Sequence, residues 1–343
     1  MAKTLHKQIN LQKVQGPDNT YTCDWHTDWA FGITLHGGCT AAGIYSALTT
    51  HLAHTPTPTS SNPPQIPPPL HPRSLHHNHH HPPHRRNKHN PPSHPHPIFQ
   101  SQDPRHRHGH QLQHPPRPSS PSEWTLLPPP NPLPNFKAVE SNQKDPNWVM
   151  GRIKGEFLPF TDRMLILAPR QGHTTNGVHD GWYKLLYANN DNEEYSPDHE
   201  GGVDNTLLTF LADALPSMSD MLMRTGGAYD PHGIQSRMVA WESADIRNKR
   251  RPAVVRNLLK DAMKAEAFSN TVTLDVELKK RVDPNRGNGW FLIRTTAKML
   301  EKGRMDVDVV IADENMELLV VAQQTVLVLE AGRKFSKGRK AAL

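Results

Sequence analysis

Residues 269–330, SNTVTLDVELKKRVDPNRGNGWFLIRTTAKMLEKGRMDVDVVIADENMELLVVAQQTVLVLE, decide the fold. Val, Leu, Ile and Thr concentrate in four runs, which predict strands over residues 270–282, 289–300, 304–313 and 317–330. The segments DPNRGNG, EKG and DENM between these runs have the chemistry of turns. Four such runs predict an antiparallel meander, and the helical pattern upstream of it makes the unit α+β.

The chain contains two similar units, each a strand, two glycines and a helix. In the second unit Gly201 and Gly202 precede VDNTLLTFLADALPSM, which predicts a helix that ends before Pro216. In the first unit Gly37 and Gly38 precede a helix with small and apolar residues at helical spacing. A spacing of roughly 165 residues between the units indicates an internal duplication. Downstream of the second unit, RPAVVRNLLKDAMKAEAF (residues 251–268) predicts an amphipathic helix opened by a proline.

Residues 55–134 differ in composition from the rest of the chain. They hold 24 of the 33 prolines, and residues 54–114 hold 15 of the 23 histidines. Proline has no amide hydrogen for a β-ladder, so this tract cannot form the central sheet expected after the first helix. Four interpretations stay open: a low-complexity insertion, a His-rich metal-binding tract, an interaction segment on a scaffold, and a frameshift or mis-spliced replacement of strands.

Charge and composition narrow the class of protein. The net charge of +6 comes partly from the 55–134 tract, which lacks interleaved aromatic residues, so no nucleic-acid partner is expected. Two cysteines, Cys23 and Cys39, make no disulfide framework and indicate reduced thiols. The first ten residues show no apolar leader, and the apolar run at 318–329 is too short to span a membrane.

The two units resemble the hotdog fold, an antiparallel sheet wrapped around a central helix. Together they are similar to double-hotdog acyl-CoA thioesterases of the thioesterase II (TesB-like) type, particularly their fungal thioesterase-like relatives. The resemblance rests on DWAFGITLHGGCTAAGIYSALTTHL, DNTLLTFLADALPSM and the strand runs quoted above, and covers residues 10–54 and 136–335. It implies the start of a first hotdog at 1–54, an interrupting segment at 55–135, a second hotdog at 136–335 and a basic tail at 336–343.

The resemblance also implies a site. In this family an Asp, a Thr and a Gln of the second hotdog orient and activate a hydrolytic water, and they correspond here to Asp213, Thr273 and Gln324. Gln323 would replace Gln324 if the register slipped by one residue. Substrate binding is expected at the two glycine pairs, Gly37, Gly38, Gly201 and Gly202. No metal and no cofactor are expected.

Hydrolysis of a thioester needs a base for water and donors for the developing oxyanion, and these residue types can supply both. We therefore expect a hydrolase that acts on acyl-CoA or a similar acyl thioester. The alternative is a non-catalytic acyl-binding or interaction hotdog protein; a hotdog dehydratase is less favoured, because no Asp/His hydratase motif is found. A homo-oligomer through the hotdog sheets is an assembly that the resemblance allows. The expected location is intracellular and cytoplasmic, since the C-terminal KAAL is not a peroxisomal signal.

Overall fold

The computed structural model describes residues 9–15, 20–25, 29–31, 34–54, 96–97, 124–130, 132–156, 158–188, 195–196, 203–213, 218–224, 229–244, 252–262, 265–283 and 289–330. The 55–134 tract lies outside the described residues except for 96–97, 124–130 and 132–134. The four interpretations of that tract, and the domain boundaries at 54 and 135, therefore stay predictions.

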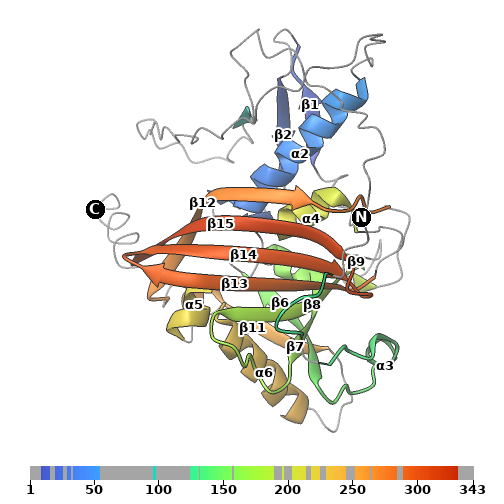
Figure 1. The fold of residues 1–343 in the computed structure, drawn as a ribbon, viewed down its shortest axis with the longest axis vertical. Helices are drawn as coiled ribbons and strands as arrows, with labels where there is room; N and C mark the ends of the chain where they lie inside the picture. Colours follow the sequence, from blue (N-terminus) through green and yellow to red (C-terminus); the bar gives the residue numbers. More distant parts are fainter. Residues whose placement is uncertain are drawn as a thin grey trace, which may run out of the picture.

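One eight-stranded sheet organises the second half of the chain (Figure 1). Its strands, in spatial order, are β11 (Ala253–Asn257), β6 (Trp148–Gly155), β7 (Met164–Pro169), β8 (Val178–Leu185), β13 (Phe291–Glu301), β14 (Arg304–Asp313), β15 (Leu318–Glu330) and β12 (Ala267–Leu278). All neighbours pair antiparallel except β11 and β6, which are parallel. The sheet curves around the short helix α4 (Asn205–Leu211), which is the arrangement of a hotdog fold.

Helix α4 is buried almost all round, as a helix enclosed by a sheet must be. Every residue from Thr206 to Leu211 is buried. The helix begins at an Asp204 cap, whose side chain accepts a hydrogen bond from the Leu207 amide at 2.7 Å. The side-chain oxygen of Asn205 accepts from the Val282 amide at 3.0 Å, which ties the start of the helix to the chain after β12.

The sheet has an apolar core on each face. Phe291 and Ile293 of β13 face the α4 side, while Trp290 and Leu292 face the opposite side, because side chains alternate along a strand. The opposite face is covered by the segment that carries α3 (Phe136–Glu140), with Phe136 packing edge-on against Trp182 of β8 at 4.9 Å between ring centroids.

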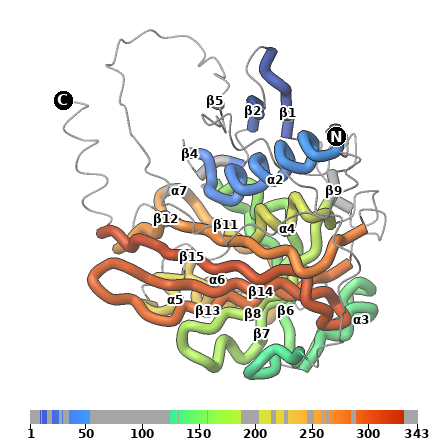
Figure 2. Tube along the Cα trace, turned by 45° about the horizontal axis from the view of Figure 1, so that its top comes forward, coloured from blue at the N-terminus to red at the C-terminus, as the bar shows by residue number. Residues whose placement is uncertain are grey.

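The first half of the described chain is smaller. It consists of α2 (Gly37–His54), the sheet β1 (Asn10–Lys13), β2 (Tyr21–Asp24) and β5 (His96–Pro97), and the pair β3 (Ala30–Phe31) and β4 (Thr34–Leu35). The strand β5, which contains a proline, lies at the edge of its sheet. Helix α2 packs against α4, so the two central helices are neighbours in both views (Figures 1 and 2).

Two predicted elements were wrong. Residues 251–268 do not form one helix: they contain strand β11, the single turn α7 (Leu259–Ala262) and the start of β12. The β-branched pair Val254 and Val255 pairs in parallel with β6, and this tertiary pairing overrides the local helical pattern. The four C-terminal strands are not a simple meander either, because β12 pairs with β15 and β13 pairs with β8.

The remaining elements complete the second half. They are η2 (Pro159–Arg163), β9 (Tyr187–Ala188), β10 (Tyr195–Ser196), α5 (Met218–Met223) and α6 (Pro231–Ala244).

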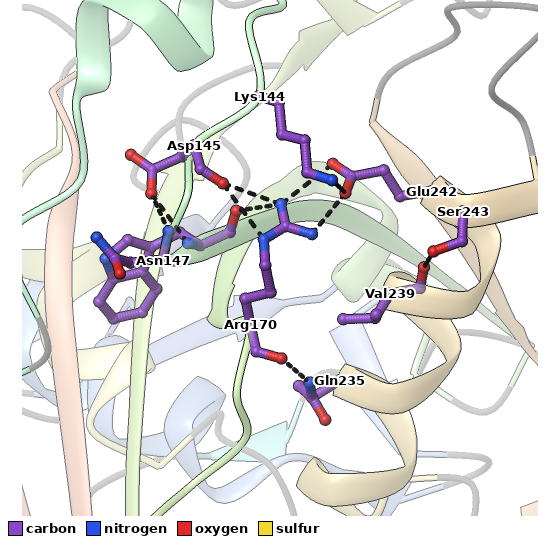
Figure 3. Close-up of polar contacts among 9 residues, drawn as sticks. Lys144, Asp145, Asn147, Arg170, Gln235, Val239, Glu242 and Ser243 are labelled. Atoms are coloured by element: carbon purple, nitrogen blue, oxygen red, sulfur yellow. Dashed lines mark hydrogen bonds and ion pairs between the residues drawn. The ribbon is translucent and has the colours of Figure 1, made fainter.

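A partly buried arginine ties α6 to the sheet (Figure 3). Arg170, directly after β7, donates to both carboxylate oxygens of Glu242 on α6, at 2.5 and 3.3 Å. The same guanidinium donates to the carbonyls of Asp145 and Trp148 at 3.0 and 2.9 Å. The Arg170 carbonyl accepts from the Gln235 side chain at 2.8 Å. The planar fork of arginine is needed to reach all these acceptors at once.

Arg170→Lys should therefore lower the free energy of unfolding by about 2–3 kcal/mol, because a single ammonium cannot replace the several hydrogen bonds of the fork. Urea unfolding measures the change. Lys280→Gln is the matched control, since Lys280 and Glu317 form an ion pair in which both side chains are 48% exposed. The control should change the stability by less than about 1 kcal/mol. Equal losses in the two variants would contradict the structural role of Arg170.

Three histidines cluster where α6 meets the loop between β7 and β8. The ring of His173 lies 4.6 Å from that of His179 and 5.5 Å from that of His232, between centroids. One buried ring nitrogen of each has no hydrogen-bond partner among the described residues. Burial, reinforced by mutual repulsion, lowers the pKa of His173 to about 2 and that of His179 to about 3. Asp180 opposes the shift of His173.

This cluster should make the fold acid-labile. The unfolded chain binds protons on the imidazoles of His173 and His179 below about pH 6.5, whereas the folded chain does not, so stability falls as the pH falls through that value. Each of His173 and His179 should cost about 2 kcal/mol between pH 6.5 and pH 5. Urea midpoints across this range, compared with those of His173→Gln, test the point. The variant should lose less stability than the unsubstituted protein, and parallel profiles would exclude His173 as a contributor.

Candidate active site

Asp213 lies immediately after α4, at the junction of the two halves. The helix ends at Leu211, and the Asp213 amide donates to the Phe210 carbonyl at 3.2 Å, which holds the residue in the turn after the helix. Its side chain is only 4% exposed. A buried carboxylate requires hydrogen-bond donors, and the surrounding elements determine which donors it has.

Thr271 of β12 is the threonine that contacts Asp213. Its Oγ1 donates to Asp213 Oδ1 at 2.7 Å. The predicted Thr273 lies two residues farther along the strand, where its Oγ1 accepts from the Thr325 amide at 3.3 Å. The register of β12 against β15 shifts between the two threonines. The extra residue of this β-bulge, Val272, decides which of them meets the helix turn, and no sequence pattern reveals a bulge.

Gln324 of β15 reaches the same turn. Its Nε2 donates to the carbonyl of Ala212, one of the last carbonyls of α4 and therefore without a partner inside the helix. Gln324 lies on the same face of β15 as the buried residues Ala322 and Val326, whereas Gln323 is exposed. The structure thus brings Gln324, and not Gln323, beside Asp213.

The first half contributes the start of α2. A Cβ added to Gly37 would lie 2.4 Å from Asp213 Oδ2, and one added to Gly38 would lie 2.4 Å from the Phe210 carbonyl oxygen. Only glycine allows this approach, which explains the glycine pair that the sequence indicated. The positive end of the α2 dipole favours the carboxylate placed there. Gly201 and Gly202, the other predicted pair, lie outside the described residues.

His36, directly before α2, also lies at this site, although the sequence around its glycine pair favours a close backbone approach over a catalytic histidine. Its Nδ1 lies 3.5 Å from Asp213 Oδ2 and accepts a hydrogen bond from the Gly38 amide at 3.1 Å. Burial lowers the pKa of His36, and the nearby Asp213 only partly opposes the shift. The imidazole is therefore neutral near pH 7.

Aromatic rings pack together at the junction beside these groups. Trp29 stacks on Phe160 at 6.1 Å and meets Phe210 edge-on at 5.2 Å, between ring centroids. The His36 ring lies 5.9 Å from Phe160 and 5.8 Å from Phe210. Rings from both halves thus form one cluster, in which the guanidinium of Arg163 lies 5.1 Å from the Trp29 ring centroid.

The described residues contain no group of three or more His, Cys, Asp or Glu side chains that could hold a metal ion. Within the same residues, no helix combines the length and the apolar character needed to cross a membrane. The groups that converge at the junction are the Asp213 carboxylate, the Thr271 hydroxyl, the Gln324 amide, the neutral imidazole of His36 and the N-terminus of α2.

Residues 132–328 match the family model of the acyl-CoA thioesterase C-terminal domain. The chain belongs to this family. The match contains α4, the whole eight-stranded sheet except its last two residues, and all three predicted polar residues of the site. Among curated proteins, the thioesterase-like protein TwmA of Talaromyces wortmannii is 21% identical over 206 residues, or 59% of this chain. The chain spans about half of that relative, 53% of its length.

Solved structures give weaker similarities. A hot dog fold protein of unknown function from Alicyclobacillus acidocaldarius is 13% identical, with 95% of this chain and 98% of that chain covered and a TM-score of 0.47. The acyl-CoA thioesterase II TesB2 of Mycobacterium marinum is also 13% identical, with 62% and 58% covered and a TM-score of 0.28.

The glycine contact between the halves of this thioesterase-family chain can be tested by adding one methyl group. Gly38→Ala should destabilise the fold by about 1–3 kcal/mol, because its Cβ would meet a backbone oxygen that cannot move away. The thermal midpoint measures the loss. Gly233→Ala on α6 is the control, since the nearest atom to its new Cβ lies 3.8 Å away. The control should be neutral or stabilising, and a neutral Gly38→Ala would refute the close contact.

Proposed function

We propose that this protein hydrolyses acyl-CoA or a related acyl thioester by direct attack of water. The observation that carries the proposal is the buried Asp213 carboxylate, held by Thr271 beside the Gln324 amide and facing the N-terminus of α2. Membership of the acyl-CoA thioesterase C-terminal domain family supports the reaction type.

In the proposed mechanism Asp213 is the general base. It takes a proton from a water molecule, and the resulting hydroxide adds to the thioester carbonyl carbon. The oxyanion collapses, the C–S bond breaks, and the thiolate takes the proton from Asp213. The products are a carboxylic acid and a free thiol. No covalent acyl-enzyme forms.

Thr271 and Gln324 orient the carboxylate and the water in this scheme. The Thr271 hydroxyl donates to Asp213 and has lone pairs that can accept a hydrogen bond from water. One N–H of Gln324 is engaged by Ala212, which leaves a second N–H and an oxygen of that amide for water. Thr271 is held in its role by its contact with Asp213, and Gln324 by its contact with Ala212, both in the turn after α4.

We assign the oxyanion to the N-terminus of α2. The amides of Cys39 and Gly38 are engaged by the carbonyl and the Nδ1 of His36, respectively. Among the described residues no hydrogen bond is found for the amide of Gly37, a residue whose Cβ position would lie 2.4 Å from Asp213 Oδ2. Gly37 is therefore the proposed donor to the developing negative charge, assisted by the helix dipole.

Removal of the base tests the proposal. Asp213→Asn should lower kcat for thiol release from a panel of acyl-CoA substrates by about 100-fold or more, because the amide cannot accept the proton from water. Release of free thiol is followed with a thiol-reactive chromophore. Asp275→Asn is the control, since it removes the same charge from an exposed position of β12 and should leave the rate unchanged. Equal rates in the two variants would remove Asp213 from the mechanism.

Two further outcomes separate the alternatives. An acyl-CoA that binds to the protein but releases no thiol would support the non-catalytic acyl-binding protein instead.

Paired threonine variants decide whether Thr271, which contacts Asp213, or Thr273, which the sequence predicts, takes part in the reaction. Thr271→Val should lower kcat by about 10-fold through loss of one hydrogen bond to a charged group, and Thr273→Val should lower it less. The reverse order would restore Thr273 to the mechanism.

A further inference from the structure

His36 and Asp213 face each other in an unusual way. Nδ1 of His36 and Oδ2 of Asp213 are 3.5 Å apart, beyond the range of a normal hydrogen bond, although both side chains are buried at 15% and 4% exposure. A neutral imidazole can present either an N–H or a lone pair at Nδ1, and its hydrogen bonds show which.

The Gly38 amide assigns the tautomer. Because this N–H donates to Nδ1 at 3.1 Å, Nδ1 carries a lone pair and the ring proton lies on Nε2. A lone pair and a carboxylate oxygen then face each other with no hydrogen between them. This arrangement gives no attraction while Asp213 is ionised, but it becomes an O–H···N hydrogen bond when Asp213 Oδ2 gains a proton.

We infer that His36 is a positioning residue for Asp213: after the Asp213 carboxyl group has taken the proton of water, the single Nδ1 lone pair of His36 exchanges its hydrogen bond from the Gly38 amide for one from that carboxyl group. The inference rests on the proposed function. The proton leaves water, resides on Oδ2 while hydrogen-bonded to Nδ1, and passes to the thiolate when the C–S bond breaks. The imidazole is neutral at the beginning and at the end, so charge and protons balance.

The surroundings fix His36 for this task. Its ring is held against Phe160 and Phe210, and its carbonyl accepts from the Cys39 amide at 3.0 Å at the first turn of α2. A residue that only filled space between these rings would not need a nitrogen at the Nδ1 position, and a residue that only capped the Gly38 amide would change stability rather than kcat. The two roles, packing and acceptance of the proton-bearing carboxyl, therefore predict different effects for substitutions of similar size.

Three variants of the full-length protein separate these roles. His36→Asn keeps a polar atom at the Nδ1 position, His36→Gln keeps one near the Nε2 position, and His36→Phe keeps only the ring. Steady-state kinetics with acyl-CoA should show kcat reduced by about 10-fold or more in the Phe and Gln variants, with KM within about 3-fold. His36→Asn should recover most of the rate. Thermal midpoints identify any variant that fails to fold. If His36→Phe fails to fold, the comparison of His36→Asn with His36→Gln decides the question alone.

The outcomes distinguish this inference from the proposed function. His36→Phe combined with Asp213→Asn should be no slower than Asp213→Asn alone, because His36 acts through Asp213. If Asp213→Asn abolishes thiol release while His36→Phe keeps the full rate, or if Gln rescues and Asn does not, the inference is overturned and the proposed function stands. If the unsubstituted protein releases no thiol from any acyl-CoA, both are overturned.

Discussion

The approach of α2 to α4 is the contact on which the rest of the structure depends. The start of α2 meets the Phe210 carbonyl so closely that even a methyl group at Gly38 would collide with it. This contact places the N-terminus of one central helix against the last turn of the other, with the aromatic rings of both halves closed around it. Asp213 lies in that turn, so the same contact determines both the relative position of the halves and the geometry of the candidate site.

The sheet reaches the same turn through polar groups that the fold must satisfy in any case. The Ala212 carbonyl has no partner within α4, and Gln324 supplies one; Asp213 is buried, and Thr271 supplies a donor. Each bond stabilises the fold and also fixes a group of the candidate site. Substitution at these positions therefore changes stability and chemistry together.

Local patterns predicted the residues of the strands well and their neighbours poorly. Residues 304–313 were predicted as a strand and are β14, because alternation and turn residues are local signals. Pairing of β12 with β15 is not local, and neither is the bulge that brings Thr271 instead of Thr273 to Asp213. For a similar reason the sequence favours a close backbone approach over a catalytic role for His36: a histidine beside two glycines has no distinctive pattern until α4 is folded against it.

The order of strands has a consequence for the newly made chain. Thr271 lies on β12 and Gln324 on β15, and these strands are neighbours in the sheet although β13 and β14 separate them in the sequence. Until residues near 330 have left the ribosome, β12 has no neighbour in the eight-stranded sheet, and the carbonyl end of α4 has no glutamine to cover it. The candidate site is thus assembled in the last step of synthesis of this sheet, and an unfinished chain exposes an apolar helix and an unpaired strand edge to chaperones and proteases.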